Sequence, residues 1–337
     1  MKNIRLSFIV PCYKAEQYIE RCITSLVRQD IPESEYEIIC VNDCSPDNTR
    51  DRIVEIKKVY KNIILIDHEV NKGPGCARNT GLRSAKGNYI WFVDSDDSIT
   101  ENILEETMLK LENNKLDIIT FNFYDQKKNG DYVRETANYI HIENVIDGET
   151  FLRDNFTAIV LSPWSKIFKK KFLEQYNLFF EEGVFWEDAD YIIKAIYLAK
   201  KILVIPDYLY YYTYNENAIT KTHSGKKYAD LVKVGARKLI FYEEIKNKSP
   251  EIAQLLYNDA LWNATIVRRI LYLSVKERNI FYALLKSEEF ESIKKAVKSK
   301  KLKFLYKYPH LVNISLFLIS PLILWSRKLL KIIMRSN

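Results

Sequence analysis

Glycine and proline are scarce in this sequence, with nine residues of each among 337. Long flexible linkers are therefore not expected. The five cysteines all lie in the first quarter of the chain, without a C-x-x-C pair or a neighbouring histidine that would indicate a zinc module. A secreted protein stabilised by disulfides would also have cysteines in the other three quarters of the chain. We expect reduced, mostly buried thiols in a cytoplasmic protein, at Cys12, Cys22, Cys40, Cys44 and Cys76.

Acidic residues are absent from position 292 to the C-terminus, a segment that holds eleven lysines and arginines. The positive charge of these eleven residues exceeds the net charge of +7 of the whole chain, so the rest of the chain carries a small net negative charge. A nucleic-acid-binding protein normally spreads its basic charge over the binding surface. We therefore expect no nucleic-acid partner. The basic tail indicates an anionic membrane surface instead, with RNA as the weaker alternative for the tail.

An apolar run long enough to cross a bilayer is also missing. Residues 311–325 are uncharged and largely apolar, but a spanning helix needs about 20 such residues, and this run contains Asn313 and Pro321. We expect an interfacial or re-entrant helix on the cytoplasmic face of the membrane, with a buried C-terminal helix as the alternative. The N-terminus reaches Pro11 without completing an apolar signal region, which predicts a first strand rather than a signal peptide.

The first 125 residues contain a regular alternation of apolar runs and helix-like segments. The apolar, β-branched runs are Leu6–Val10, Tyr36–Val41, Ile63–Ile66, Tyr89–Val93 and Leu116–Phe121. The segments with helical spacing between them are Ala15–Arg28, Asn48–Tyr60, Gly75–Ser84 and Ile103–Glu112. This alternation predicts an α/β fold with a mostly parallel sheet flanked by helices. Ligands of such sheets bind at the carboxyl ends of the strands.

The sequence after residue 125 contains fewer patterns that predict secondary structure. Residues 127–131 predict a hairpin turn. A helix is expected to begin near Trp186, followed by a short strand, residues 202–205, that ends at Pro206. Beyond Lys226 the pattern is helical, with segments at 228–246, at 250–273 and from 276 onward. We therefore expect a helical C-terminal extension.

The acidic tetrad Asp94-Ser95-Asp96-Asp97 directly follows the apolar run 89–93. Carboxylates at the end of a buried strand repel one another and are costly to desolvate. A divalent cation between them removes both costs, and hard oxygen ligands suit Mn²⁺ or Mg²⁺. The alternative is a solvated acidic turn that caps the next helix.

Three further polar segments are expected at the ends of the other strands. Tyr13 offers a ring for stacking, and Asp43 offers a carboxylate that can accept hydrogen bonds from a base or a ribose. The turn Gly73–Gly75 opens a helix whose N-terminus can support a phosphate, and Arg78 adds positive charge there. Each feature alone has an ordinary structural explanation, but all of them fall on one edge of one sheet.

Four motifs together resemble the glycosyltransferases of family 2, which have the GT-A fold. They are S-F-I-V-P-C-Y-K-A-E-Q-Y-I, V-N-D-C-S-P-D-N-T, N-K-G-P-G-C-A-R-N-T-G and Y-I-W-F-V-D-S-D-D, in the order and spacing of the family. The clear resemblance covers about residues 4–125 and continues more loosely to about 223. It implies transfer of a sugar from a nucleotide-diphosphate donor, commonly a UDP-sugar, in bacterial surface-polysaccharide synthesis.

The resemblance also implies roles for individual residues. The nucleotide-sugar would be bound by Pro11, Tyr13, Asp43, Arg78, Asp94 and Ser95. The metal would be bound by Asp96. The second motif usually carries glycine where this sequence has Cys44, which makes that loop less permissive.

An acidic pair at the start of a helix supplies the catalytic base in the family. Glu187-Asp188 matches this pair, so Asp188 is the implied base, with Glu187 in support. The alternative is two ordinary acids in a first helical turn. The segment Trp164–Phe168 is similar to a W-N-K-L-Y-like motif, and we expect Trp164 and Trp186 to contact the acceptor.

The chain departs from the family in the segment that follows. Thr213 stands where the family commonly has arginine, and Ala218 stands where it has serine. This puts in doubt a phosphate contact that Lys221 could supply instead. His223 is a candidate further metal ligand or, equally, a surface histidine.

We therefore expect a GT-A catalytic domain at 1–223, with a nucleotide-binding half at 1–125 and an acceptor half at 126–223. A helical extension at 224–303 and a basic, apolar, membrane-associating tail at 304–337 would follow. The expected partners are a nucleotide-diphosphate sugar, a glycan or lipid-linked acceptor and the inner face of the membrane. Two alternatives stay open. One is a sugar nucleotidyltransferase, although the first strand lacks a glycine-rich phosphate loop. The other is a non-catalytic nucleotide-sugar or glycan-binding module.

Overall fold

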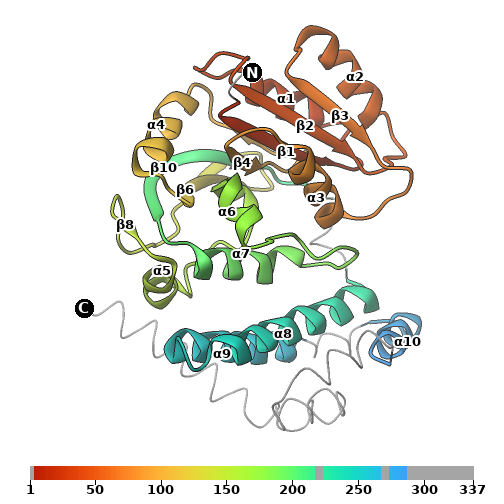
Figure 1. Cartoon of the computed structure of the whole chain (residues 1–337). Helices are drawn as coiled ribbons and strands as arrows, with labels where there is room; N and C mark the ends of the chain where they lie inside the picture. Colours follow the sequence, from red (N-terminus) through yellow and green to blue (C-terminus); the bar gives the residue numbers. More distant parts are fainter. Residues whose placement is uncertain (1–3, 217–222, 267–272, 287–337) are drawn as a thin grey trace. The chain divides into compact units, whose positions relative to one another are not determined.

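A computed structural model describes residues 4–216, 223–266 and 273–286 of the protein, and the chain divides into two compact units, 1–222 and 223–337 (Figure 1). In the first unit the described residues form one ten-stranded sheet of order β3-β2-β1-β4-β9-β6-β10-β5, with β7 beside β6 and β8 beside β10. The strands are β1 (Leu6–Cys12), β2 (Tyr36–Asn42), β3 (Ile63–Asp67), β4 (Tyr89–Phe92), β5 (Ser98–Ile99), β6 (Ile118–Gln126), β7 (Tyr132–Glu135), β8 (Val145–Ile146), β9 (Lys166–Lys169) and β10 (Ile202–Tyr212).

Helices cover both faces of this sheet, and their order along the chain follows the expected alternation. Those of the first unit are α1 (Ile19–Val27), α2 (Thr49–Val59), α3 (Pro74–Ser84), α4 (Leu104–Asn114), α5 (Gly148–Asn155), α6 (Lys170–Gln175) and α7 (Glu187–Leu198), with the 3₁₀ turn η1 at Pro163–Ser165. The second unit contains α8 (Gly225–Ile245), α9 (Pro250–Ile266) and α10 (Val275–Leu284).

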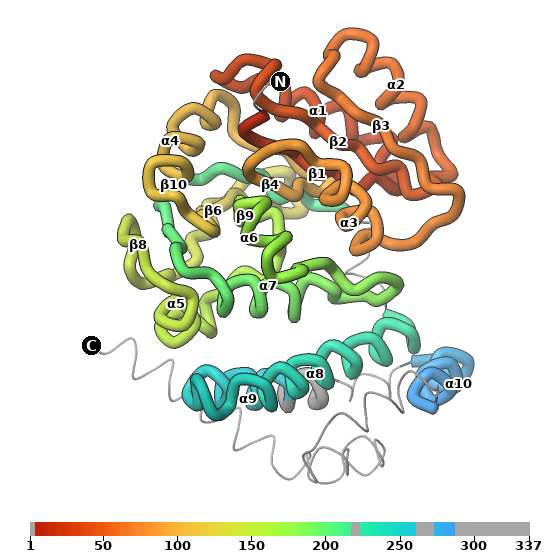
Figure 2. Tube along the Cα trace, viewed as in Figure 1, coloured from red at the N-terminus to blue at the C-terminus, as the bar shows by residue number. Residues whose placement is uncertain are grey.

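The strands β1 to β4 run parallel, and β1 is buried on both faces. Phe8 and Val10 belong to the core that α1 and α2 close, whereas Ile9 points to the opposite face and meets α3. There a Cβ on Gly81 would lie 2.3 Å from the side chain of Ile9, so only glycine allows α3 to approach this closely. Helices on opposite faces of one parallel sheet confirm the predicted layering (Figure 2).

The remaining strands mix directions. β9 lies antiparallel between β4 and β6, and β10 runs parallel to β6. The hairpin predicted at residues 127–131 joins β6 to β7. The prediction that a strand ends at Pro206 is wrong, because β10 continues to Tyr212. The pairing of β10 with β6 shifts register between Val204 and Tyr208, so Pro206, which has no N–H, lies at an irregularity of the ladder.

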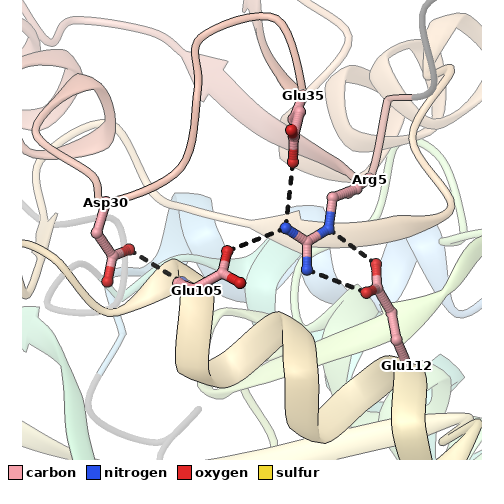
Figure 3. Close-up of polar contacts among 5 residues, drawn as sticks. All are labelled: Arg5, Asp30, Glu35, Glu105 and Glu112. Atoms are coloured by element: carbon pink, nitrogen blue, oxygen red, sulfur yellow. Dashed lines mark hydrogen bonds and ion pairs between the residues drawn. The ribbon is translucent and has the colours of Figure 1, made fainter.

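The amino ends of the strands are closed by a cluster of charged residues around Arg5 (Figure 3). Its guanidinium bonds both carboxylate oxygens of Glu112, at 2.9 and 3.0 Å, and reaches Glu35 and Glu105 at 3.1 Å each. The backbone N–H of Glu105 donates in turn to Asp30. This cluster joins β1 to α4 and to the loop before β2, at the end of the sheet opposite to the candidate site.

The second unit is helical where it is described. Tyr228, Ala229 and Val232 of α8 share an apolar cluster with Ala260 of α9 and Phe281 of α10. The prediction of helices beyond residue 226 is confirmed for the described residues, with ends that differ by a few positions. In residues 4–216, 223–266 and 273–286 no helix has both the length and the apolar character needed to cross a membrane. The predicted membrane-associating tail, 304–337, lies outside the described residues.

Candidate active site

The acidic tetrad lies in the turn that links β4 to β5, at the carboxyl edge of the sheet. Asp97 is fully buried there. It accepts hydrogen bonds of 2.7 Å from the hydroxyl of Tyr210 and from the backbone N–H of Thr213. Burial, with Asp96 and Asp94 nearby, raises the pKa of Asp97 well above its ordinary value. Asp97 is thus a structural anchor that ties the turn to the end of β10.

The other two carboxylates of the turn are half-buried. Asp94 uses Oδ1 to bind Arg78, and Asp96 uses Oδ2 to accept from Asn215 at 2.9 Å. Burial and the charge of Asp94 raise the pKa of Asp96. Within the described residues, no other residue donates a hydrogen bond to Asp94 Oδ2 or to Asp96 Oδ1. The turn therefore presents free carboxylate oxygens whose mutual repulsion a cation would relieve.

Asp94 and Asp96 fit a Mn²⁺ or Mg²⁺ site whose coordination a bound substrate completes. Across the described parts of the chain, no three His, Cys, Asp or Glu side chains gather so that they could hold a metal ion. Mg²⁺ is commonly bound through one or two carboxylates, with substrate phosphates and water completing its shell. Asp94 and Asp96 suit that kind of site, in which the substrate brings part of the coordination.

Arg78 joins the tetrad to the second acidic pair. Its Nη2 donates to Asp94 over 2.8 Å and its Nη1 donates to Glu187 over 2.6 Å, although the two acids are 93 positions apart in the sequence. Arg78 is 6% exposed. Burial lowers its pKa, but Asp94 and Glu187 outweigh that effect and raise it, so the guanidinium stays charged. The predicted donor site and the predicted base are therefore brought together.

Asp188 is half-buried in the first turn of α7, next to Glu187. Burial, followed by the negative charge of Glu187, raises the pKa of Asp188 to about 7. Trp186 precedes the pair with φ of 67°, a left-handed backbone that is costly for a bulky residue. Its side chain is 37% exposed. This backbone sets the direction in which α7 begins and leaves the indole ring, next to the acids in sequence, partly exposed.

Asp43, the residue after β2, is a predicted nucleotide-binding residue that three protein contacts hold in place. Its Oδ1 lies 2.7 Å from Nδ1 of His68 and accepts from the backbone N–H of Lys72, and its Oδ2 accepts from the N–H of Gly73. The other ring nitrogen of His68 meets the hydroxyl of Thr80 at 2.9 Å. Asp43 is 2% exposed. A carboxylate offers about four lone-pair positions, so these three contacts leave one position on Oδ2 without a partner among the described residues.

Pro11 and Tyr13 occupy the end of β1 beside this edge. Tyr13 is 39% exposed, which leaves its ring available for stacking, whereas Ser95 is 8% exposed and lies inside the turn. Cys44 is exposed and has φ of 54°. Its backbone thus adopts the left-handed conformation that glycine adopts without strain, as the departure from the usual glycine suggested.

Trp164 lies in the core of the first unit, next to the end of β10. It is 5% exposed and stacks on Tyr210 at 4.4 Å and on Tyr212 at 5.6 Å between ring centroids. Its carbonyl accepts from the indole of Trp91. The ring therefore packs in the core and supports the tyrosines at the end of β10. The expectation that Trp164 contacts the acceptor remains a prediction.

His223, the candidate further metal ligand, is the first residue of the second unit, where its Nδ1 lies 3.0 Å from the hydroxyl of Tyr228. Lys221 lies outside the described residues. The roles suggested for both remain predictions.

Two basic residues near the site were not identified from the sequence. Arg21 of α1 donates from Nη2 to the carbonyl of Asp96 and to the hydroxyl of Thr213. Lys166 is fully buried at the start of β9, and burial lowers its pKa to about 7. Its Nζ donates to the carbonyl of Val160 and to Ser165. Helical spacing gives no signal for the contacts of Arg21, because its partners are 75 and 192 positions away in the sequence. The partners of Lys166 lie within six positions, in the turn before β9.

Known proteins resemble the chain in both sequence and structure. The model of glycosyl transferase family 2 matches residues 7–177. The uncharacterized glycosyltransferase EpsJ of Bacillus subtilis is 34% identical over 220 residues, which cover 64% of this chain and 63% of EpsJ. A poly(ribitol-phosphate) beta-glucosyltransferase of Bacillus spizizenii is 36% identical over 211 residues, which cover 62% of this chain and 32% of that protein. The chain thus spans only part of the length of these relatives.

The same likeness extends to a solved structure. Residues 1–349 of Staphylococcus aureus TarS, crystallised in complex with UDP-GlcNAc, match with a TM-score of 0.70 at 26% identity, over 93% of this chain and 89% of that one. The mixed, mostly parallel sheet with its flanking helices is therefore the GT-A fold, as predicted.

Proposed function

The chain belongs to glycosyl transferase family 2, and on that premise we propose that it transfers a sugar from a UDP-sugar to an acceptor hydroxyl, with inversion and with a divalent metal. The observation that carries the proposal is the double contact of Arg78 with Asp94 and Glu187. This contact holds the turn of Asp94 next to the start of α7, which supports a metal and diphosphate site beside a base. Such convergence is what a single-displacement reaction requires.

Asp188 is the proposed general base. Its raised pKa, about 7, keeps a large fraction ionised at neutral pH while making it a stronger base than an ordinary aspartate. The acceptor hydroxyl gives its proton to Asp188 as its oxygen attacks the anomeric carbon, and the bond from that carbon to the diphosphate oxygen breaks. Glu187 is held by Arg78, so its role is to position the base and the acceptor.

Negative charge builds on the diphosphate as it leaves, and a nearby positive charge would stabilise it. Asp96 would hold Mn²⁺ or Mg²⁺ with the free Oδ1, and Asp94 would contact the sugar or ribose with its free Oδ2. When bound, the metal supplies neutralisation of the charge that builds on the leaving group.

The nucleotide would lie along the ends of β1 and β2. Tyr13 would stack on the base beside Pro11, and the remaining lone pair on Asp43 Oδ2 would accept from a base N–H. The presence of UDP-GlcNAc in the TarS complex supports a uridine donor. Poly(ribitol phosphate), in the name of the Bacillus spizizenii relative, supports a surface polymer as acceptor. We place the enzyme on the cytoplasmic face of the membrane, attached through its basic C-terminal tail.

Purified protein incubated with UDP- and GDP-sugars, Mn²⁺ and poly(ribitol phosphate) tests the proposal. We expect UDP release that requires one UDP-sugar and the acceptor, and that is lost in Asp188→Asn. Pyrophosphate release would indicate a nucleotidyltransferase instead. Tight donor binding without turnover on any acceptor would indicate a binding module.

A further inference from the structure

Four tyrosines and one arginine gather on one face of the sheet, toward the carboxyl end of β6. Tyr124 of β6 is paired with Tyr211 of β10 on one side and with Arg134 of β7 on the other, and residues paired in this way point to the same face. Phe123 and Tyr212 instead pack against the core on the opposite face. We call this group of residues the tyrosine patch: Tyr124, Tyr132, Arg134, Tyr208 and Tyr211.

The rings of the tyrosine patch fix one another in place. Tyr211 stacks on Tyr124 with ring centroids 4.6 Å apart and 12° between the ring planes. The ring of Tyr132 meets Tyr211 edge-on at 5.2 Å, and the ring of Tyr208 lies 5.1 Å from that of Tyr124. The hydroxyl of Tyr208 is also hydrogen-bonded to Thr136. Rings that are already ordered lose little conformational entropy when a ligand binds to them.

The tyrosine patch is open to solvent. Tyr132 is 38% exposed, Arg134 is exposed, and the other three tyrosines are half-buried. The guanidinium carbon of Arg134 lies over the ring of Tyr208, 5.3 Å from its centroid. Among the described residues none accepts a hydrogen bond from the side chain of Arg134 or forms an ion pair with it. A guanidinium that lies over a ring keeps its N–H groups, which point outward in its plane, for another partner.

The order of the strands places the tyrosine patch on one side of the acidic turn and the proposed nucleotide site on the other. β4, which leads into the turn, separates β1 and β2 from β6 and β10. The patch is joined to the turn directly after Tyr211, since the N–H of Thr213 donates to Asp97 and the amide of Asn215 donates to Asp96. A donor bound at the ends of β1 and β2 therefore leaves the side of the patch for the acceptor.

We propose that the tyrosine patch binds the acceptor, as a chain of polyol or sugar units joined by phosphodiesters. The C–H groups of such units pack on aromatic rings, and two parallel N–H groups of Arg134 match two oxygens of a phosphodiester. Tyrosine and arginine are also the side chains that most often dominate the binding energy of a surface. The inference rests on the proposed function, because it assumes that the enzyme transfers a sugar to such a polymer.

The variants change the two exposed members of the tyrosine patch. Tyr132→Ala removes the outermost ring and Tyr132→Phe keeps it, whereas Arg134→Ala removes the charge and Arg134→Lys keeps the charge without the paired N–H groups. Arg83→Ala and Phe179→Ala are the matched controls. Arg83, at the end of α3, lies over the ring of Phe179 at 5.0 Å, and Phe179 is 37% exposed.

The experiment measures steady-state kinetics with poly(ribitol phosphate) at a saturating concentration of the UDP-sugar that the enzyme accepts, and UDP binding by calorimetry with Mn²⁺. We expect KM for the polymer to rise about tenfold in Arg134→Ala and about fivefold in Tyr132→Ala. The value for Arg134→Lys should be intermediate, and Tyr132→Phe should match the unmodified enzyme. UDP affinity and kcat should be kept in all four variants, because the patch contacts neither the donor nor the base.

Three results would overturn the inference while the proposed function stands. In the first, both alanine variants of the patch match Arg83→Ala and Phe179→Ala in KM for the polymer, which is the result of a purely structural role. In the second, only Tyr132→Ala raises KM, which removes the phosphodiester contact. In the third, light scattering shows a dimer that Tyr132→Ala converts to a monomer, which assigns the patch to an interface between copies. Failure of the unmodified protein to bind UDP or any UDP-sugar would instead remove the proposed function itself.

Discussion

Arg78 donates a hydrogen bond of 2.6 Å from Nη1 to Oε1 of Glu187, and both side chains are buried. The two residues are 109 positions apart, so only the folded chain brings them together. Removing one partner of a buried ion pair leaves an uncompensated charge, which costs more than the pair itself contributes. The arrangement of the acids therefore depends on the hydrogen bonds that Arg78 donates to them.

Replacement of Arg78 by lysine should lower kcat about 100-fold, because a single ammonium cannot hold Asp94 and Glu187 in their present positions and small misplacements of catalytic groups are costly. Steady-state assays of UDP release provide the measurement. Arg83→Lys, on the exposed end of the same helix, serves as the control. Near-normal activity in Arg78→Lys would show that the double contact is dispensable.

Replacement of Asp188 by asparagine should reduce kcat by about 10² to 10⁴ while donor binding is kept. The base acts only when ionised and has its pKa raised to about 7. Below that value it is protonated and inactive, so kcat/KM should rise with pH through about 7 and then level off. The pH profile of the unmodified enzyme checks this. A profile that is flat from pH 5 to 8 would assign the base to another group.

Removal of divalent metal should weaken donor binding. Since Asp96 is proposed to hold the cation, Mn²⁺ should increase the UDP-dependent rise in melting temperature of the unmodified protein and have little effect on Asp96→Asn. Thermal shift with Mn²⁺ or with EDTA measures both. Asp47→Asn, in the loop after β2, is a carboxylate control outside the turn. Equal Mn²⁺ effects in Asp96→Asn and the unmodified protein would contradict the metal assignment.

Replacement of Cys44 by glycine should stabilise the fold by about 1 kcal/mol. The backbone there has φ of 54°, which costs a residue with a Cβ roughly that amount relative to glycine. Chemical denaturation compares the variants. Cys44→Ala should show no such gain, since alanine keeps the Cβ, and this separates the backbone effect from loss of the thiol.

Replacement of Arg5 by alanine should destabilise the fold by about 2 kcal/mol, because Glu35, Glu105 and Glu112 then face one another without a cation. The side chain of Arg5 is 14% exposed, so water cannot fully compensate. Denaturation midpoints measure the loss, with Arg52→Ala as an exposed control. Activity per folded molecule should be unchanged, since this cluster lies at the end of the sheet opposite to the acids.

The sequence alone determined the α/β alternation, the turn that carries Asp94 and Asp96, and the start of α7 at Glu187. These are local properties, since apolar runs specify buried strands and a polar stretch after each run specifies its carboxyl end. Since parallel strands end at one edge, their polar ends had to converge. The course of β10 past Pro206 was missed, because pairing with β6 overrides the local signal of a proline.

Only the tertiary structure decided which side chains meet. Trp164 carries an aromatic ring that the sequence could place equally well at a binding wall or in the core, and packing against Tyr210 decided for the core. Arg78 and Arg21 are both arginines near one turn, yet one is buried between two acids and the other is exposed. Contacts between distant segments depend on how helices pack on the sheet, and no local pattern encodes that geometry.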